Sequence, residues 1–292
     1  VNLATGIPEE DGLRCMYHGW KYDASGRCIE QPAEPAGSTF MDKVRVKAYP
    51  VEVLGGLVWA YLGPSPASLL PRWDLFAKQG VFRQVGATVI PANWLQCQEN
   101  SADSWHAHFT HGWYARYILE RREDRGLPIT DHMRRSVAMF LDPDLKHAYE
   151  PHPNGMMKRR RRVNESDDAY GWKTGHPMVF PNYVRIGKKG WLAFQMRVPI
   201  DDTHTWHLHY EMIDPGDDVV VPPQDVVPMF DVPLMEMPDY ILGQDFVAWH
   251  EQGVIADRTK EMLGKSDEGV IMFRRMLQEQ IEVVQDGGDP IN

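Results

Sequence analysis

Two carboxylates and three histidines crowd into residues 99–111, between an apolar run and a Gly-Trp pair. Asp103 and His106 are three residues apart, so a helix would put both on one face, where the carboxylate could accept a hydrogen bond from the ring N–H of a metal-bound histidine. His111 follows His106 by five residues, and both can reach one metal only if the helix bends or ends there. The crowding favours a metal site, although a helix with ordinary core or surface histidines would have the same residues.

A second candidate site is the pair Cys15 and His18, which a Gly-Trp step follows. Asp23 and Gly26 then indicate a tight turn between two strands. On a loop of a β domain, Cys-x-x-His can be half of a zinc site or half of an iron-sulfur site with mixed ligands. A buried cysteine beside an unrelated histidine is the alternative, and the pattern alone leaves both open.

Asp245 is a carboxylate in apolar surroundings, since Phe246, Val247 and Trp249 follow it closely. If it is buried, it needs a cation, a metal ion or hydrogen-bond donors, whereas at a helix N-terminus backbone N–H groups would suffice. Two histidines and one carboxylate on one side of a metal form the facial triad of non-haem Fe(II) oxygenases. The same donors could hold zinc for hydrolysis, so these residue types do not choose the metal.

The elements that must position these residues indicate an α+β protein with two domains. Short β-branched runs at 43–51 and 57–62 indicate a small antiparallel β domain at the start. The proline-rich stretch 64–71 predicts a domain boundary, which separates residues 1–66 from residues 67–292.

The second domain is expected to place helices over an antiparallel sheet. Apolar spacing predicts helices over 94–105 and 113–123, and a last helix that begins with Ser266 as its N-cap and stops at Asp286. Three strands are expected, over 179–186, 191–199 and 203–213. About half of 130–180 is expected to be loop, and 224–239 is expected to be a loop that could cover a pocket.

Composition and charge narrow the class of protein and its partners. The 31 basic and 41 acidic residues give a formal net charge of -10, which argues against nucleic acid or an anionic membrane as a partner. The basic run 158–162 is followed by three acidic residues, so a solvated or self-neutralised loop is expected there. Three cysteines are too few to staple 292 residues, and no signal peptide or bilayer-spanning apolar stretch is seen, so a cytoplasmic location is expected. The opening on Val1, without an initiator methionine, suggests a fragment.

Three segments together resemble one known family. Cys15-Met16-Tyr17-His18-Gly19-Trp20 is similar to the second half of the Rieske [2Fe-2S] motif, in which Cys-x-His precedes Cys-x-x-His. Asp103-x-x-His106-x-x-x-x-His111, with Gln244-Asp245 far downstream, resembles the catalytic motif of the large (alpha) subunits of Rieske non-haem iron aromatic ring-hydroxylating oxygenases, in the phthalate dioxygenase-like branch. No Cys-x-His precedes Cys15, so an N-terminally truncated member is expected, with that pair just upstream of Val1.

The resemblance implies roles for particular residues. Cys15 and His18 would bind the Rieske [2Fe-2S] cluster, two of whose four ligands are absent from this chain, and His106, His111 and Asp245 would hold a mononuclear Fe(II). Asp103 would bridge His106 to the cluster of a neighbouring subunit, and Glu99 would support the site.

It also implies a fold, an activity and partners. Residues 1–66 would be a partial Rieske domain and residues 67–292 a helix-grip-like catalytic domain, in a homotrimer or a multiple of trimers. Electrons from NAD(P)H would arrive through a reductase or ferredoxin, and O2 would react with an aromatic, carboxylated substrate. An O-demethylase or monooxygenase of the same family is the alternative outcome. A zinc-dependent hydrolase or a metal-stabilised binding module is the alternative from a different class.

Overall fold

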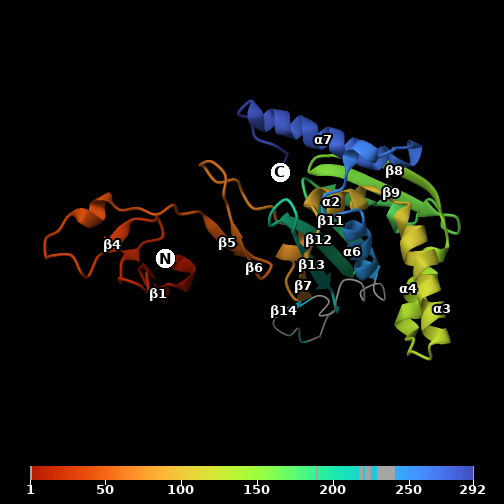
Figure 1. The fold of residues 1–292 in the computed structure, drawn as a ribbon, viewed down its shortest axis with the longest axis horizontal. Helices are drawn as coiled ribbons and strands as arrows, with labels where there is room; N and C mark the ends of the chain where they lie inside the picture. Colours follow the sequence, from red (N-terminus) through yellow and green to blue (C-terminus); the bar gives the residue numbers. More distant parts are fainter. Residues whose placement is uncertain (1, 189, 217–219, 221–224, 229–240, 292) are drawn as a thin grey trace. The chain divides into compact units, whose positions relative to one another are not determined.

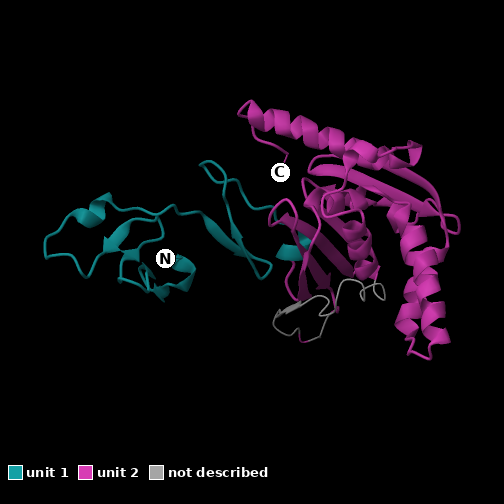
Figure 2. Ribbon diagram, viewed as in Figure 1, with its two compact units in different colours: residues 1–77 teal, residues 78–292 magenta. Residues whose placement is uncertain are grey.

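The computed structural model describes residues 2–188, 190–216, 220, 225–228 and 241–291 (Figure 1). The chain forms two compact units, 1–77 and 78–292 (Figure 2). The proline-rich stretch predicts a boundary after residue 66, whereas the first unit extends to Ala77. A physical reason lies in helix α1 (Asp74–Ala77), where the Phe76 ring packs edge-on against Trp59 with ring centroids 5.2 Å apart.

The first unit is a small antiparallel β structure, as the sequence predicts. Its four-stranded sheet has the order β1-β2-β3-β4 and is followed by a separate hairpin, β5-β6. Gly26 closes the predicted turn at φ 80°, and its N–H donates to the carbonyl oxygen of Asp23 at 2.9 Å. Residues 43–51 are not the strand that the sequence predicts. The elements are η1 (Leu3–Thr5), β1 (Ile7–Glu9), β2 (Gly12–Arg14), β3 (Lys21–Tyr22), β4 (Cys28–Glu30), η2 (Phe40–Lys43), β5 (Val51–Leu54) and β6 (Leu57–Ala60).

The second unit is organised around an eight-stranded sheet with the order β14-β7-β13-β12-β11-β10-β9-β8. Every neighbouring pair is antiparallel except β14 and β7, which run parallel. The three predicted strands correspond to β11, β12 and β13, so the α+β class is confirmed. The strands are β7 (Phe82–Ile90), β8 (Asp144–His152), β9 (Gly155–Arg162), β10 (His176–Val179), β11 (Tyr183–Lys188), β12 (Trp191–Pro199), β13 (Thr205–Ile213) and β14 (Asp225–Pro228).

Helices α2, α6 and α7 pack with this sheet to form the core (Figure 1). In one cluster Ile90 of β7 and Cys97 of α2 meet Phe246 of α6, and in the other Met156 of β9 meets Phe273 of α7. Burying one side chain of this size stabilises the folded protein by roughly 1.5–3 kcal/mol relative to leaving that side chain exposed. The helices are α2 (Trp94–Ala102), the π-helix η3 (Ala107–Tyr114), α3 (Ala115–Asp124), α4 (Asp131–Leu141), α5 (Tyr170–Lys173), α6 (Ile241–Glu251) and α7 (Glu268–Gln285), with short 3-10 turns η5 (Arg258–Lys260) and η6 (Lys265–Asp267). Within the described residues no helix is long and apolar enough to cross a membrane.

Three local predictions are wrong. The stretch 130–180 contains α4, β8, β9, α5 and β10 rather than being half loop, and the basic run 158–162 lies on β9, so it is not a loop. Long charged side chains conceal a strand, because they have no apolar alternation to mark it. The N-cap of α7 is Asp267, since the turn η6 precedes the helix and includes Ser266. Of the predicted loop 224–239, residues 225–228 form β14, and the remainder lies outside the described residues.

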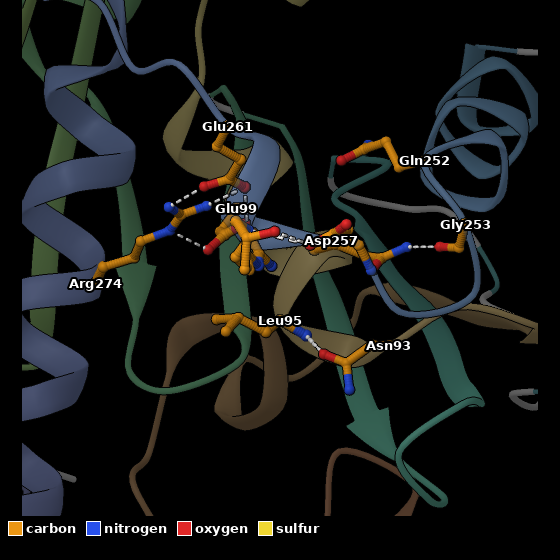
Figure 3. A network of polar contacts seen from close by, with 12 residues as sticks. Asn93, Leu95, Glu99, Gln252, Gly253, Asp257, Glu261 and Arg274 are labelled. Atoms are coloured by element: carbon orange, nitrogen blue, oxygen red, sulfur yellow. Dashed lines mark hydrogen bonds and ion pairs between the residues drawn. The ribbon is translucent and has the colours of Figure 1, made fainter.

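The resemblance implies that Glu99 supports the histidines. In the structure, its side chain instead connects α2 to the C-terminal part of the chain. Its carboxylate forms an ion pair with Arg274 of α7, from Oε1 to Nε at 2.6 Å, and a second ion pair with Arg258. Arg274 also pairs with Glu261, and Figure 3 shows Glu99 and Glu261 on the two sides of this guanidinium. The Glu99 side chain is only 8% exposed, so its charge depends on these two partners.

Replacing Glu99 with glutamine is therefore expected to lower the free energy of unfolding by roughly 2 kcal/mol. A fully buried pair loses about 3–5 kcal/mol when one partner is removed, but the arginine side chains here are 26% and 32% exposed, which reduces the loss. Urea unfolding measures the difference. Glu120→Gln removes the same charge from an exposed pair with Arg116 and is expected to change stability by less than about 0.5 kcal/mol. Equal effects of the two substitutions would contradict this account of Glu99.

Candidate metal centre

The contact between Asp103 and His106 arises from a capped turn and not from the continuous helix that the spacing suggests. Helix α2 begins after Asn93, whose side chain accepts the N–H of Leu95 at 3.0 Å, and it ends at Ala102. Asp103 has extended backbone angles, φ -87° and ψ 132°. Its carboxylate accepts the backbone N–H of Trp105 at 2.8 Å and of His106 at 3.1 Å.

The ring of His106 is oriented by the same carboxylate. Nδ1 of His106 lies 3.1 Å from Oδ2 of Asp103, and because a carboxylate only accepts, this nitrogen carries the hydrogen. Nε2 of His106 is thereby left with a free lone pair. The predicted contact between Asp103 and His106 is present, but it is formed by a turn with extended backbone at Asp103 and not by a continuous helix.

The ring of His111 lies beside the ring of His106 because the chain bends into a π-helix, η3. The N–H of Ala115 donates to the carbonyl oxygen of Thr110, the wide i to i+5 bond of this conformation, and the rings of His106 and His111 come to 5.4 Å. A bend between the two histidines is what their five-residue spacing requires. Wide turns of this kind recur at functional sites.

Gly112 allows helix α4 to pack tightly behind His111. A Cβ atom at Gly112 would lie 2.5 Å from the carbonyl oxygen of Phe140, closer than any side chain tolerates. The resulting approach places the Phe140 ring 5.2 Å from the ring of His111. The glycine in the Gly-Trp pair after His111 is thus a packing requirement of the site.

Asp245 completes the group from the middle of α6, so it is not the N-cap that was the alternative role for this residue. It is 5% exposed and His111 is 4% exposed. Oδ1 of Asp245 lies 3.2 Å from Nε2 of His111 and 3.8 Å from Nε2 of His106. The three ligand atoms all lie within 4.8 Å of one another, and among the described residues this is the group able to hold a metal ion.

The hydrogen-bond pattern fits a bound cation. Nδ1 of His111 donates to Oε1 of Gln244 at 2.9 Å, so the Nε2 atoms of both histidines present lone pairs toward Asp245. Oδ1 of Asp245 is buried and has no hydrogen-bond partner within the described structure. Three converging lone-pair donors repel one another in a buried site, and a divalent metal removes that repulsion. Sequence reasoning did not assign Gln244 a role, although its position directly before Asp245 was the available signal.

Electrostatics keep both carboxylates of the site ionised. Burial alone would raise the pKa of Asp103, but the hydrogen bonds from His106 and Trp105 hold it at about 2. Burial also opposes ionisation of Asp245, and the neighbouring His111 and His106 lower its pKa below the ordinary range. For His111 burial acts to lower the pKa, but the adjacent Asp245 outweighs burial and raises it, so that Nε2 holds a proton more readily than a free imidazole does until a cation displaces it. The site therefore presents negative charge to a cation at neutral pH.

His108 has a structural role, in agreement with its place outside the matched spacing. Its Nδ1 lies 3.0 Å from the carbonyl oxygen of Phe140, to which it donates, and its Nε2 accepts the indole N–H of Trp113 at 3.0 Å. Both ring nitrogens are used, so neither can bind the metal.

Cys15 and His18 lie on the loop between β2 and β3 of the first unit. The loop is closed by the N–H of Cys15, which donates to the carbonyl oxygen of Trp20 at 2.7 Å, and Gly19 adopts φ 75°. Both candidate ligands border a cavity of about 270 Å³. An open space beside a thiol and an imidazole on one loop fits part of an iron-sulfur cluster with mixed ligands.

Comparison with known proteins places two family domains at the ends of the chain. Residues 1–50 match the Rieske [2Fe-2S] domain, and residues 235–292 match the domain described as LigXa C-terminal domain like. The first contains the Cys15–His18 loop, and the second contains Asp245.

Two relatives that are similar over almost the whole chain are both named as oxygenase subunits. The oxygenase subunit of 5,5'-dehydrodivanillate O-demethylase from Sphingobium sp. is 37% identical, over 99% of this chain and 66% of the relative. The oxygenase subunit of phthalate 4,5-dioxygenase from Pseudomonas putida is 30% identical, over 100% of this chain and 72% of the relative. The chain thus spans about two thirds of the length of these proteins.

A solved structure shares the fold. NdmA of Pseudomonas putida CBB5 superposes with a TM-score of 0.65 over 98% of this chain and 76% of that structure, at 18% identity.

Proposed function

Because this chain belongs to the Rieske oxygenases, at 30% identity or more to two of their oxygenase subunits, we propose that it is the oxygenase subunit of a ring-hydroxylating dioxygenase that acts on an aromatic substrate. The observation that carries the proposal is the convergence of His106, His111 and Asp245, whose ligand atoms lie within 4.8 Å of one another. An Fe(II) ion held there would supply the chemistry of O2, and a [2Fe-2S] cluster at Cys15 and His18 would supply electrons from a reductase or ferredoxin.

The protein's own residues have the following roles in this proposal. Asp103 and Gln244 hold the two imidazoles with Nε2 facing inward, so that metal binding requires no rotation of either ring. Phe140 covers one side of His111 and limits access of water. The Asp103 side chain is 28% exposed while it contacts His106, which suits a residue that connects the iron site to a cluster on a neighbouring subunit of a trimer.

O-demethylation is the second candidate, and the higher identity to the O-demethylase subunit favours it. Both reactions use the same iron site and the same electron source. They differ in where the atoms of O2 go: a dioxygenase places both in the ring product, whereas an O-demethylase places one on the methyl carbon, which leaves as formaldehyde with that atom, and reduces the other to water, so the phenol product keeps the ether oxygen.

Turnover under ¹⁸O2 with the reductase, NADH and aromatic acids as substrates tests the proposal. The expected result is substrate-dependent O2 uptake, with iron bound in addition to the cluster and ¹⁸O in the product. Two labelled atoms in the ring product indicate the dioxygenase, whereas formaldehyde release with an unlabelled aromatic product indicates the demethylase. Tightly bound zinc with hydrolysis and no O2 uptake would instead establish the zinc hydrolase, and bound metal without any turnover would favour the binding module.

A further inference from the structure

The loop that carries Cys15 and His18 is exposed along its outer side. The two side chains between these residues are 59% and 67% exposed, and His18 is exposed as well. Two backbone bonds close the loop on itself: the N–H of Cys15 donates to the carbonyl oxygen of Trp20 at 2.7 Å, and the N–H of Gly19 donates to that of Cys15 at 3.0 Å. Contacts that fix the loop to the rest of the first unit must therefore come from its inner side.

Arg14, the residue directly before Cys15, supplies such a contact. Its Nη1 donates to the carbonyl oxygen of Gly19 at 2.8 Å. Gly19 adopts φ 75°, which glycine tolerates and other residues rarely do, and a Cβ atom there would lie 3.2 Å from Cγ of Pro32. The guanidinium thus holds the backbone at the residue that directly follows His18.

The guanidinium of Arg14 is itself held by two carboxylates of the four-stranded sheet. Nε and Nη2 donate to the two oxygens of Glu9, at 2.5 and 3.1 Å, and Nη2 also donates to Oε2 of Glu30 at 2.7 Å. Glu9 lies on β1 and Glu30 on β4, which are the two edge strands of the sheet. The planar fork of donors in arginine fits this arrangement, whereas a single ammonium group does not reproduce it.

A second cation shares the same carboxylates without reaching the loop. Nζ of Lys21 lies 3.3 Å from Oε2 of Glu9, 3.3 Å from Oε2 of Glu30 and 3.1 Å from Oδ2 of Asp11. In the described part of the chain the side chain of Lys21 forms no bond to residues 15–20. We call these five residues, Arg14, Lys21, Glu9, Glu30 and Asp11, the loop anchor.

The loop anchor stays charged at neutral pH. Hydrogen bonds from Arg14 lower the pKa values of Glu9 and Glu30, so both carboxylates remain ionised. Ion pairs at a protein surface stabilise a fold only slightly, so the distinctive feature of Arg14 is its bond to a carbonyl oxygen of the ligand loop.

A cation at this position also acts on a cluster held by the loop. The reduction potential of an iron-sulfur cluster depends on the charges around it. Reduction adds one negative charge to the cluster, and a nearby guanidinium stabilises that charge. Arg14 therefore has two separable effects, one through the geometry of the loop and one through its charge.

We propose that Arg14 is a positioning residue for the [2Fe-2S] cluster, which fixes the ligand loop to both edge strands through the carbonyl of Gly19 and raises the reduction potential of the cluster. Arg14 does not ligate iron, and it acts through the backbone that carries Cys15 and His18. Because the loop anchor lies within the first unit, this role does not depend on the substrate or on the reaction at the iron site.

Measurements on the cluster itself, in the chain extended upstream to carry the complete cluster motif, test this role. Arg14→Met removes both the bonds and the charge. Its cluster absorbance in excess iron chelator is expected to decay about 10-fold faster than that of the wild type. Its potential in a dye-mediated titration is expected to fall by about 30–60 mV, which is a 3- to 10-fold change in the reduction equilibrium at 59 mV per factor of ten.

Two matched variants separate geometry from charge. Arg14→Lys keeps the charge without the fork, and it is expected to keep the wild-type potential while it releases the cluster nearly as fast as Arg14→Met. Lys21→Met removes the same charge from the same carboxylates, and it is expected to lower the potential while it releases the cluster at the wild-type rate. If Arg14→Met assembles no cluster, Arg14→Lys and Lys21→Met decide the question.

Any of three results would disprove the role of Arg14. The first is a cluster in Arg14→Met with the release rate and potential of the wild type. The second is release from Lys21→Met as fast as from Arg14→Met, because the whole ion network would then stabilise the unit. The third is wild-type release from Arg14→Lys, because charge alone would then suffice. Iron content and O2 uptake of the wild type judge the proposed function separately.

Discussion

Replacing His111 with alanine, in the chain extended upstream to carry the complete cluster motif, is expected to abolish product formation and the binding of mononuclear iron, while the absorbance of the [2Fe-2S] cluster is retained. His111 is 4% exposed and supplies one of three converging donors, and its Nε2 lies 3.2 Å from Asp245. Loss of an outer partner of a metal ligand typically costs 10- to 100-fold in affinity or activity, so loss of the ligand itself is expected to cost more than about 100-fold. Iron analysis and turnover with the reductase measure both effects.

The matched control for this variant is His108→Ala, three residues earlier on the same segment. Both ring nitrogens of His108 bond to protein groups, the carbonyl oxygen of Phe140 and the indole of Trp113. This substitution is expected to lower the stability by about 1–3 kcal/mol and to leave iron bound. Turnover by the His111→Ala variant, or loss of iron from His108→Ala alone, would show that the ligand set is wrong.

Replacing Asp103 with asparagine is expected to separate electron transfer from iron binding. The amide has nearly the same shape, but it removes the negative charge and one of the two oxygens that now accept from His106 and from the backbone of Trp105. Iron content is expected to stay within about 2-fold of the wild type, while turnover falls by about 10- to 100-fold. In the same upstream-extended protein, stopped-flow absorbance of the reduced cluster, mixed with O2 and saturating substrate, measures the step directly as a slower reoxidation.

Asp201→Asn provides the control, because Asp201 and His204 form the same i,i+3 pair, at 3.2 Å, on an exposed loop. This variant is expected to reoxidise at the wild-type rate. If Asp103→Asn also reoxidises at the wild-type rate, Asp103 serves only to hold the turn after α2. If it loses iron in proportion to its activity, the residue supports the metal and does not connect it to the cluster.

The local part of the metal centre could be predicted from the sequence because its residues are close together in the chain. Asp103, His106 and His111 span nine residues, so one local bend is enough to bring both histidines to a metal and to place Asp103 against the ring of His106. The kind of bend could not be predicted, since a π-helix gains its stability from packing such as that of Gly112 under Phe140 rather than from residue preference.

The basic run on β9 shows where a sequence pattern misleads. Five consecutive cations indicate a solvated loop, because isolated charges avoid the interior. In the structure, pairing with β8 and β10 forces the side chains to alternate, so that Arg159 and Arg161 form ion pairs with Glu150 and Asp167 on one face while Arg160 lies near Asp144 on the other. The inward orientation of Lys158 and Arg160 is a property of sheet register, which no local pattern of lysine and arginine encodes.

The sequence by itself determined the α+β class, the turn at Asp23 and the identity of the residues that can bind metal, because these depend on local spacing and donor chemistry. The tertiary structure decided which of these residues meet. Asp245 and Gln244 reach His111 across more than 130 residues of chain only because α6 and α2 pack together with β7 around Phe246 and Cys97. It likewise decided that Glu99 stabilises α7 and not the iron site, since burial and partners are set by packing and not by proximity in sequence.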